Sequence, residues 1–518
     1  MPDRTLLNSE VNEKLQALLS NANAARIISQ AIEGTIGPKG LDIMMVDTLG
    51  DVVISNDGVT ILKLMAVNHP AARMIINTAR AQQAEVGDGT TTATILAGAL
   101  VSEGVNQVMK GVPVTQVIEG IKLGIERSIE LIEKQSRPVN SENDPILLSV
   151  ASIAGRGQED IAELVIKGAI IIGREKMLSP DYKFADAVTA MEAAVSQVFM
   201  GTLINKEPIS HEMPRCLDSI HILAVDDALA PEDIDSEARS TEAGFQYYLQ
   251  NKKQYETNLR KICSMGVKLV LAERSIDDLG EQIFTEAGVI AIQRVSQREI
   301  EKVCKHTGAH KIKRSGLNRP IEQLQNYLGK AAGVKVNDKL GCTCLFDGSG
   351  EAMATVVIGA ATEEVVDEKE RIARDAASAV QAALQKGVVP GGGAIEIWVA
   401  KKLEELAQDL KGMTSYGVLC VKEALLRPFA CIAANAGLNP LEKMGDVIAE
   451  QKQKGLDSIA IDCDRGCLID VFEKGIVDPA LVKIHAVKAA GEVAVAILRI
   501  NTIIKMRDGE SYSQDILE

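Results

Sequence analysis

The sequence has 518 residues, of which 46% are hydrophobic and 25% charged, and its 71 acidic and 56 basic residues leave a net charge of −15. At about 100–200 residues per domain, this length predicts about three domains. The negative balance argues against nucleic acid or an anionic membrane as the main partner, because phosphate binding needs a concentrated cationic surface.

Other features of the composition predict a cytoplasmic protein. No apolar run approaches the roughly 18–20 residues of a membrane-spanning helix, and the first residues are too polar for a signal peptide. The nine cysteines are scattered along the chain and do not indicate a disulfide framework, which favours the reducing cytoplasm.

The first third of the chain alternates helical patterns with glycine loops. Residues 137–141, Arg-Pro-Val-Asn-Ser, have the composition of a linker and predict a domain boundary. The elements expected before it are a helix over 11–32, strands over 42–46 and 52–54 joined by a turn over 48–51, a helix over 70–85 and a helix from about Thr90.

The middle of the chain alternates short β-branched runs with helical patterns, which predicts an α/β unit with a partly parallel sheet. The remainder is mainly helical. The elements expected here are strands over 220–225, 267–271 and 289–292, helices over 233–263 and 277–287, and a strand over 354–358 that leads to a helix from about Thr362 to Gly387.

The most informative motif is Gly-Asp-Gly-Thr-Thr-Thr-Ala-Thr at 87–94. A glycine loop that opens directly into a helix presents backbone N–H groups and a positive dipole end to an anion. Asp88 would repel a phosphate, so its presence favours a Mg²⁺ ion between the carboxylate and the phosphate oxygens. The alternative is an ordinary helix start with a threonine as N-cap.

Further glycine loops lie at 35–40, 56–60 and 391–393. Each alone is an ordinary turn, in which Asp57 would bond to its own backbone. Asp375 lies at the edge of the apolar face of the helix predicted over 371–386. An inward carboxylate needs a partner, a metal or a chemical task, and the alternative to a task is a salt bridge.

Seven segments resemble the chaperonins, in the order of that family and over almost the whole chain: TIGPKG, GDVVISNDGVTIL, HPAARMI, EVGDGTTTATILAGAL, VVPGGGAIE, NAGLNP and GIVDPALVK. The resemblance implies an ATP-driven folding machine that encloses unfolded polypeptides. It also implies a homo-oligomer of two stacked rings, with eight subunits in each ring and no separate lid protein.

The resemblance further implies a multidomain fold. A mainly α-helical equatorial ATPase domain would comprise 1–137 and 390–518, and a small α/β intermediate domain would comprise 138–206 and 352–389. An α/β apical domain would comprise 207–351, with a helical protrusion at about 228–263.

Carried over motif by motif, the resemblance implies roles for individual residues. Asp57 and Asp375 would position the attacking water, and Asp88 would hold Mg²⁺. Such groups suit phosphoanhydride hydrolysis, which mostly needs an in-line water and charge neutralisation. Asp375 would belong to the hinge domain and reach the phosphate only on domain closure. The remaining nucleotide-binding residues would be Thr35, Ile36, Gly37, Pro38, Gly89, Thr90, Thr91 and Thr92, with Gly392 and Asp478 on the ribose and adenine side.

Three features bear on the class of chaperonin. Four aromatic residues within 245–255 resemble the helical protrusion of the archaeal and eukaryotic-cytosolic class, the alternative being a helix packed on its own sheet. Residues 358–363 look more like the bacterial class, and Arg156 stands where the archaeal class has a lysine near the γ-phosphate. Arginine keeps the charge but is a rigid fork. The mixture indicates an archaeal-type chaperonin on a divergent branch, a bacterial branch of that type included.

Two other functions are compatible with the residues alone. One is a binding module that keeps the fold without the ATPase, against which the presence of Asp57, Asp88 and Asp375 together argues. The other is a small-molecule ATP-dependent enzyme that acts as a monomer. The spacing of Cys342 with Cys344 and of Cys463 with Cys467 is not that of structural zinc sites.

Overall fold

The computed structural model describes residues 4–46, 50, 52–232 and 241–502, and only the backbone of 4–15, 363 and 364. Most of the turn expected over 48–51 and the beginning of the helix expected over 233–263 lie outside these residues. The chain divides into two compact units, Met1–Glu159 with Asp375–Glu518, and Asp160–Arg374. The division into three domains stays a prediction.

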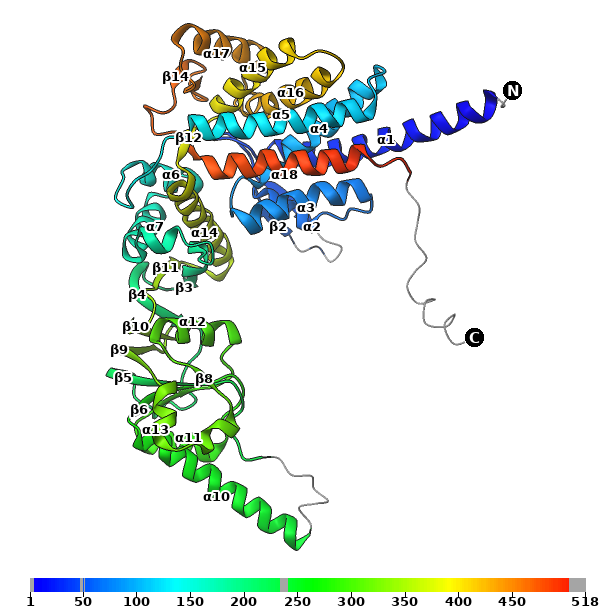
Figure 1. Ribbon diagram of the computed structural model, residues 1–518. Helices are drawn as coiled ribbons and strands as arrows, with labels where there is room; N and C mark the ends of the chain where they lie inside the picture. The colour runs from blue at the N-terminus through cyan, green and yellow to red at the C-terminus, as the bar shows by residue number, and fades with distance from the viewer. Residues whose placement is uncertain (1–3, 47–49, 51, 233–240, 503–518) are drawn as a thin grey trace, which may run out of the picture. The chain divides into compact units, whose positions relative to one another are not determined.

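The first unit is mainly helical and is built from both ends of the chain, the blue and the red segments of Figure 1. Helices α1 with α4, α4 with α18, and α5 with α16 pack in pairs. Its helices are α1 (Arg4–Glu33), α2 (Gly58–Leu64), α3 (Pro70–Glu85), α4 (Thr90–Met109), α5 (Val114–Gln135), α6 (Ile146–Ala154), α15 (Ala394–Asp409), α16 (Thr414–Asn435), α17 (Pro440–Lys454) and α18 (Ala480–Leu498), with the last part of α14 (Glu363–Lys386).

Short antiparallel strand pairs connect these helices. Strand β1 pairs with β2, β12 with β15, and β13 with β14. The pair β1–β2 agrees with the two strands expected in this region. The bounds are β1 (Ile43–Val46), β2 (Val52–Ser55), β12 (Val388–Pro390), β13 (Ile459–Ile461), β14 (Leu468–Asp470) and β15 (Val477–Pro479).

Small residues set the spacing of the helices in this aromatic-poor core. A Cβ atom at Gly120 of α5 would lie 2.7 Å from the Cα of Gly417 in α16 and would clash with the carbonyl oxygen of Thr414. The two helices therefore touch backbone to backbone at this crossing. Because the core is close-packed, no neighbouring side chain can move aside to accept a methyl group there.

The second unit contains a sheet whose described strands follow the order β3-β11-β4-β10-β9-β5-β6-β7, with β8 paired to β5. Strands β5, β6 and β7 are parallel, which confirms the partly parallel sheet. Strands β4, β9 and β10 are antiparallel neighbours that the sequence did not predict. The strands are β3 (Val188–Glu192), β4 (Gln197–Ile204), β5 (Cys216–Val225), β6 (Val267–Ala272), β7 (Ile290–Ile292), β8 (Lys311–Ile312), β9 (Gly329–Asn337), β10 (Cys342–Gly348) and β11 (Ala354–Ala360).

Helices cover both faces of the parallel part of this sheet. Leu223 and Val225 pack with α10 and α11 in one apolar cluster, and Ile222 and Ala224 pack with α12 in another. Burial on both faces explains why this strand is an uninterrupted apolar run. The helices of the unit are α7 (Glu159–Ile172), α8 (Arg174–Met177), η1 (Phe184–Ala187), α10 (Glu242–Ser264), α11 (Asp278–Glu286), α12 (Gln297–Thr307), η2 (Arg314–Asn318), α13 (Ile321–Leu324) and η3 (Gln325–Tyr327).

Helix α10 changes character along its length (Figure 1). Its second half packs on the sheet, where Leu259 and Ile262 are fully buried. Its first half keeps Phe245, Tyr247 and Leu249 exposed by 48%, 51% and 43%. The alternative of a helix packed on its own sheet therefore applies only to the second half of α10. The first half has the exposed apolar side chains that are expected of a protrusion. Across the described part of the chain, no helix is both long and apolar enough to span a bilayer.

We expect Gly120→Ala to lower the free energy of unfolding by about 1–3 kcal/mol, because the added methyl group overpacks the crossing of α5 and α16. Gly445→Ala is the matched control, since Gly445 lies in α17 and a Cβ atom there would have nothing within 4 Å. Urea denaturation followed by circular dichroism compares the two variants. Equal midpoints would show that the crossing tolerates a side chain.

Candidate functional site

Helix α4 begins with a glycine as its cap rather than with a threonine. Gly89 is the N-cap, with a φ of 76°, and Thr90 is the first helical residue. The threonine cap considered from the sequence is therefore wrong. No side chain caps this end, so the first-turn N–H groups and the positive end of the helix dipole are available to an anion.

The Asn-Asp-Gly loop lies directly against this helix start. A Cβ atom at Gly58 would lie 2.7 Å from Thr91 Oγ1 and 3.2 Å from the Thr91 nitrogen. The preceding residue, Asp57, is the N-cap of α2 and accepts hydrogen bonds through Oδ2 from the Thr60 nitrogen (2.9 Å) and hydroxyl (2.7 Å). The structural role expected for Asp57 is confirmed, and the same role places it beside α4.

Asp88 is half-buried between the two glycines of its loop and accepts a hydrogen bond from the Gly89 nitrogen at 2.6 Å. Desolvation raises the pKa of the Asp88 carboxyl, and the charges of Asp478 and Asp57 raise that pKa further, while the Gly89 bond and Lys483 lower it. Three acidic residues from distant parts of the sequence are therefore within electrostatic range of one another.

Gln82 holds the Asp88 loop in place, a role that the sequence did not indicate. It is fully buried in α3, and its amide nitrogen donates to the carbonyl oxygens of Asp88 (2.8 Å) and Val482 (3.2 Å). Its amide oxygen is 2.7 Å from Nδ1 of His485. These contacts connect α3, α18 and the loop before α4. A buried glutamine in an alanine-rich helix gave no signal of this in the sequence.

Lys483 is a second residue that the sequence did not indicate, and it forms an ion pair with Asp478. Its ammonium group is 2.8 Å from Asp478 and 2.7 Å from Glu396, whose side chain is 2% exposed. Burial opposes the charge of Lys483, but the two carboxylates together raise its pKa above the usual value. This ammonium group is thus paired with two acids, and it stabilises the charge of Asp88 only from a greater distance.

The Gly391–Gly393 loop joins β12 to α15 and lies next to Asp478. The Gly391 nitrogen donates to the Ile476 carbonyl at 3.0 Å, and a Cβ atom at Gly391 would lie 3.3 Å from Asp478 Oδ2. Gly392 has a φ of 62°, a left-handed conformation that glycine adopts without strain. The loop and Asp478 are therefore in direct contact.

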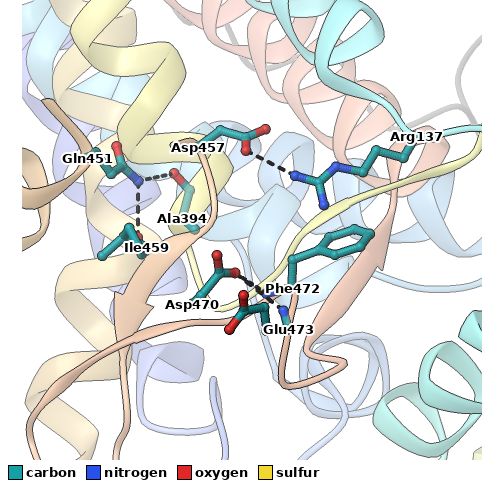
Figure 2. Close-up of polar contacts among 8 residues, drawn as sticks. All are labelled: Arg137, Ala394, Gln451, Asp457, Ile459, Asp470, Phe472 and Glu473. Carbon is teal, nitrogen blue, oxygen red and sulfur yellow. Dashed lines mark hydrogen bonds and ion pairs between the residues drawn. The ribbon is translucent and has the colours of Figure 1, made fainter. Parts of the chain in front are cut away.

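Figure 2 shows how the end of this loop is fixed. The amide nitrogen of the fully buried Gln451 donates to the carbonyls of Ala394, the first residue of α15, and Ile459 of β13, each at 3.1 Å. In the same view, the guanidinium group of Arg137 lies 3.6 Å from the ring centre of Phe472 and 3.4 Å from Asp457. Arg137 thereby ties the predicted boundary at 137–141 to the strands around the glycine loop.

Asp375 lies on the face of α14 that approaches the Asp88 loop. Ser378 lies three residues later on the same face. The distance from its Cβ atom to a Cβ atom added at Gly87 would be 2.5 Å. One turn further, Ala382 packs with Val86 and Val482. Asp375 is half-buried and belongs with the first unit in the division of the chain. Its expected role in hydrolysis, and its assignment to a hinge domain, stay predictions.

The loop at 35–38 is held by α16. Asn435 donates to the carbonyl of Ile36 at 2.9 Å, and a Cβ atom at Gly37 would lie 3.1 Å from the side chain of Ile432. Thr35 uses its hydroxyl to bond to the carbonyl of Ile32 at 2.9 Å. None of these contacts reaches Asp88, so the loop is ordered by the helix scaffold rather than by the acidic residues.

Arg156 is exposed and has a φ of 55°, which is unusual for a side chain with a Cβ atom. The preceding Gly155 lies near Ala376, the neighbour of Asp375, with 3.8 Å between a Cβ atom at Gly155 and that of Ala376. The turn that carries Arg156 thus lies along α14 in the first unit.

Comparison with known proteins gives consistent results. The sequence model of the TCP-1/cpn60 chaperonin family matches residues 28–508. A thermosome subunit of Pyrococcus abyssi is 34% identical over 95% of this chain and 92% of its own length, and the thermosome subunit beta of Archaeoglobus fulgidus is 36% identical over 93% and 91%. The crystal structure of a group III chaperonin in the open state matches with a TM-score of 0.88 and 47% identity, covering 95% of this chain and 100% of that one.

These matches extend over nearly the whole chain and agree with the order of the motifs, the helical first unit and the mixed sheet of the second. The resemblance predicted from the sequence is confirmed. The chain belongs to the TCP-1/cpn60 chaperonin family and is a subunit of an ATP-driven protein-folding chaperonin.

Proposed function

We propose that the first turn of α4 is the phosphate site of the ATPase, in which Asp57 and Asp375 position the attacking water and Asp88 holds a Mg²⁺ ion. The observation that carries the proposal is the meeting of separate glycine loops at this turn. Gly58 approaches Thr91, and Gly87 approaches α14 three residues after Asp375.

Charge balance supports the Mg²⁺ ion. Asp57 and Asp478 both act on Asp88, whereas the nearby Lys483 is already shared between Asp478 and Glu396. Such a site repels a polyphosphate unless a divalent cation is bound with it. Among the described residues no three His, Cys, Asp or Glu side chains form a metal cluster, which fits an ion held by Asp88, phosphate oxygens and water. When bound, this ion neutralises the charge of the phosphate oxygens.

The contacts of Asp57 support its proposed role in catalysis. Both bonds to Thr60 use Oδ2, which leaves Oδ1 to accept a proton from water. The bonds also fix the orientation of the carboxylate, and the adjacent Gly58 leaves room beside Thr91 because it has no side chain. Asp57 therefore orients a water toward the phosphate site rather than binding the phosphate itself.

The remaining residues complete the nucleotide site in this proposal. Asp478 and Gly392 contact the ribose and adenine, and Arg156 is near the γ-phosphate. The nucleotide is lined by Thr35, Ile36, Gly37 and Pro38. The phosphate oxygens accept hydrogen bonds from backbone N–H groups and threonine hydroxyls of Gly89, Thr90, Thr91 and Thr92.

We also propose that the subunits form a homo-oligomer of two stacked rings, eight in each ring, in the cytoplasm. The exposed first half of α10 then acts as a built-in lid, and apolar surface on the second unit captures unfolded polypeptides. The exposure of Phe245, Tyr247 and Leu249 supports the lid, because side chains of this kind favour contact with another protein surface.

We expect Asp375→Ala to retain nucleotide binding while the rate of ATP hydrolysis falls by about 10²–10⁴-fold, the usual contribution of a group that positions or activates water. Isothermal titration with ADP and a single-turnover assay with ATP and Mg²⁺ measure the two properties. Asp367→Asn is the matched control, since Asp367 is an exposed acid on the same helix. Wild-type turnover in Asp375→Ala would remove Asp375 from the mechanism.

The raised pKa of Asp88 predicts a pH dependence of Mg²⁺ binding. Mg²⁺ binds the ionised carboxylate, so a proton competes with it, and a raised pKa moves this competition above the ordinary aspartate range near about 4. The gain in nucleotide affinity on adding Mg²⁺ should therefore shrink at mildly acidic pH, and Asp88→Asn should abolish this gain at every pH. Titrations with and without Mg²⁺ at each pH measure this gain. An undiminished gain in Asp88→Asn would exclude Asp88 as a ligand.

We expect the combined change of Phe245, Tyr247 and Leu249 to serine to prevent lid closure while ATP hydrolysis and ring assembly continue. All three side chains are exposed, so the change should not disturb the fold. Negative-stain images with and without ATP report ring symmetry and closure together. Wild-type rings that stay open with ATP would contradict the built-in lid.

A further inference from the structure

The second unit contains a cavity of about 200 Å³ that has no part in the proposed ATPase site. It lies where η1, β3, β4 and β11 meet α12 and the last residue of the unit, Arg374. Its charged lining residues are Lys183, Arg298, Lys302, Arg374, Asp186 and Glu299. Four cations and two carboxylates give this cavity a positive balance, although the whole chain carries −15.

Both carboxylates of the lining are already engaged. Asp186 accepts a hydrogen bond from the guanidinium group of Arg298. Glu299 is the N3 residue of the capping box of α12, where one oxygen accepts from the nitrogen and hydroxyl of Ser296 and the other accepts from the nitrogen of Asn205. Among the described residues, neither carboxylate forms an ion pair with Lys302.

Lys302 is a half-buried cation without a carboxylate at ion-pair distance among the described residues. Its ammonium group donates to the backbone carbonyl of Asp186 at 2.7 Å. Burial lowers the pKa of Lys302, the charge of Asp186 opposes this change, and the charges of Arg298 and Arg374 lower the pKa further. Arg298 and Arg374, which line the same small space, are paired with Asp186 and Glu370. The half-buried ammonium group of Lys302 is therefore the cation whose burial an added anion would stabilise most.

Arg374 has an unused donor at the same cavity. One terminal nitrogen pairs with Glu370 at 2.8 Å, but Nε is buried and has no hydrogen-bond partner among the described residues. A buried N–H group without an acceptor is rare in native proteins and calls for an explanation. Because this nitrogen has almost no accessible surface, an anion in the cavity would reach it only after a movement of the Arg374 side chain.

We infer that this cavity binds a small anion bearing one phosphate group, which Lys302, Arg374 and Arg298 contact together. Guanidinium groups bind phosphate oxygens in a bidentate manner, and the ammonium of Lys302 adds a point charge. The volume of the cavity lies below the about 300–1,000 Å³ that is usual for sites of larger organic ligands. Inorganic phosphate or a small phosphate monoester fits this volume. The inference stands independently of the proposed ATPase site.

The test is isothermal titration of the nucleotide-free, full-length chaperonin with inorganic phosphate, and separately with glycerol 3-phosphate. We expect Lys302→Gln and Arg374→Gln each to weaken binding at one site per subunit by at least tenfold. Lys305→Gln is the matched control, since Lys305 is exposed one turn further along α12 and does not line the cavity. Phosphate that binds at the nucleotide site is common to all variants and cancels in the comparison.

Equal affinity and stoichiometry in the wild type and in both variants would overturn the inference, as would a wild type that binds neither compound at millimolar concentration. Tighter binding of one compound identifies the source of the phosphate group and supports the site. Arg298→Gln provides a second measure if either variant fails to fold, because the Arg298 side chain is 65% exposed and tolerates replacement. ATP hydrolysis measured in parallel reports separately on the proposed ATPase site.

Discussion

The absence of side chains at three glycines allows the acidic residues of the first unit to meet. Gly58 lies against Thr91, Gly87 against Ser378 and Gly89 against Val482, and any Cβ atom at these positions would overlap its neighbour. Gly58 thus reaches the first turn of α4, and the loop before α4 reaches α14 and α18, at distances that only glycine permits. The same contacts bring α2, α14 and α18 to that turn, so the spacing of the helices and the geometry of the site have one cause.

Electrostatics makes this arrangement incomplete on its own. The buried ammonium of Lys483 is shared by Asp478 and Glu396, and Asp88 receives repulsion from Asp57 and Asp478. The folded chain therefore keeps acidic groups together at a cost, as functional sites commonly do. Under the proposed function, a cation that enters with the nucleotide would lower this cost, whereas a nucleotide alone would increase it. The proposed site would thus couple the binding of the nucleotide to the binding of the metal.

The sequence predicted much of the fold because its signals are local. The bounds of α3 and the start of α4 follow from helical periodicity and glycine punctuation, and the parallel strands follow from β-branched runs. The antiparallel strand β9 has fewer apolar residues in sequence because buried and exposed positions alternate along most of it, and β10 is interrupted by threonine and aspartate. The resemblance to a family supplied what periodicity cannot, namely that the two ends of the chain belong to one unit.

The site was predicted less completely, for a physical reason. Asp57 and Asp88 stand in glycine loops that the sequence displays, but Gln82 and Lys483 stand inside helices, where a polar residue is more often exposed. Their importance depends on burial and on their partners: Gln82 bonds to Val482, 400 residues away, and Lys483 pairs with Glu396 in another helix. Only the folded chain brings such partners together, so a single sequence cannot distinguish these two residues from surface positions.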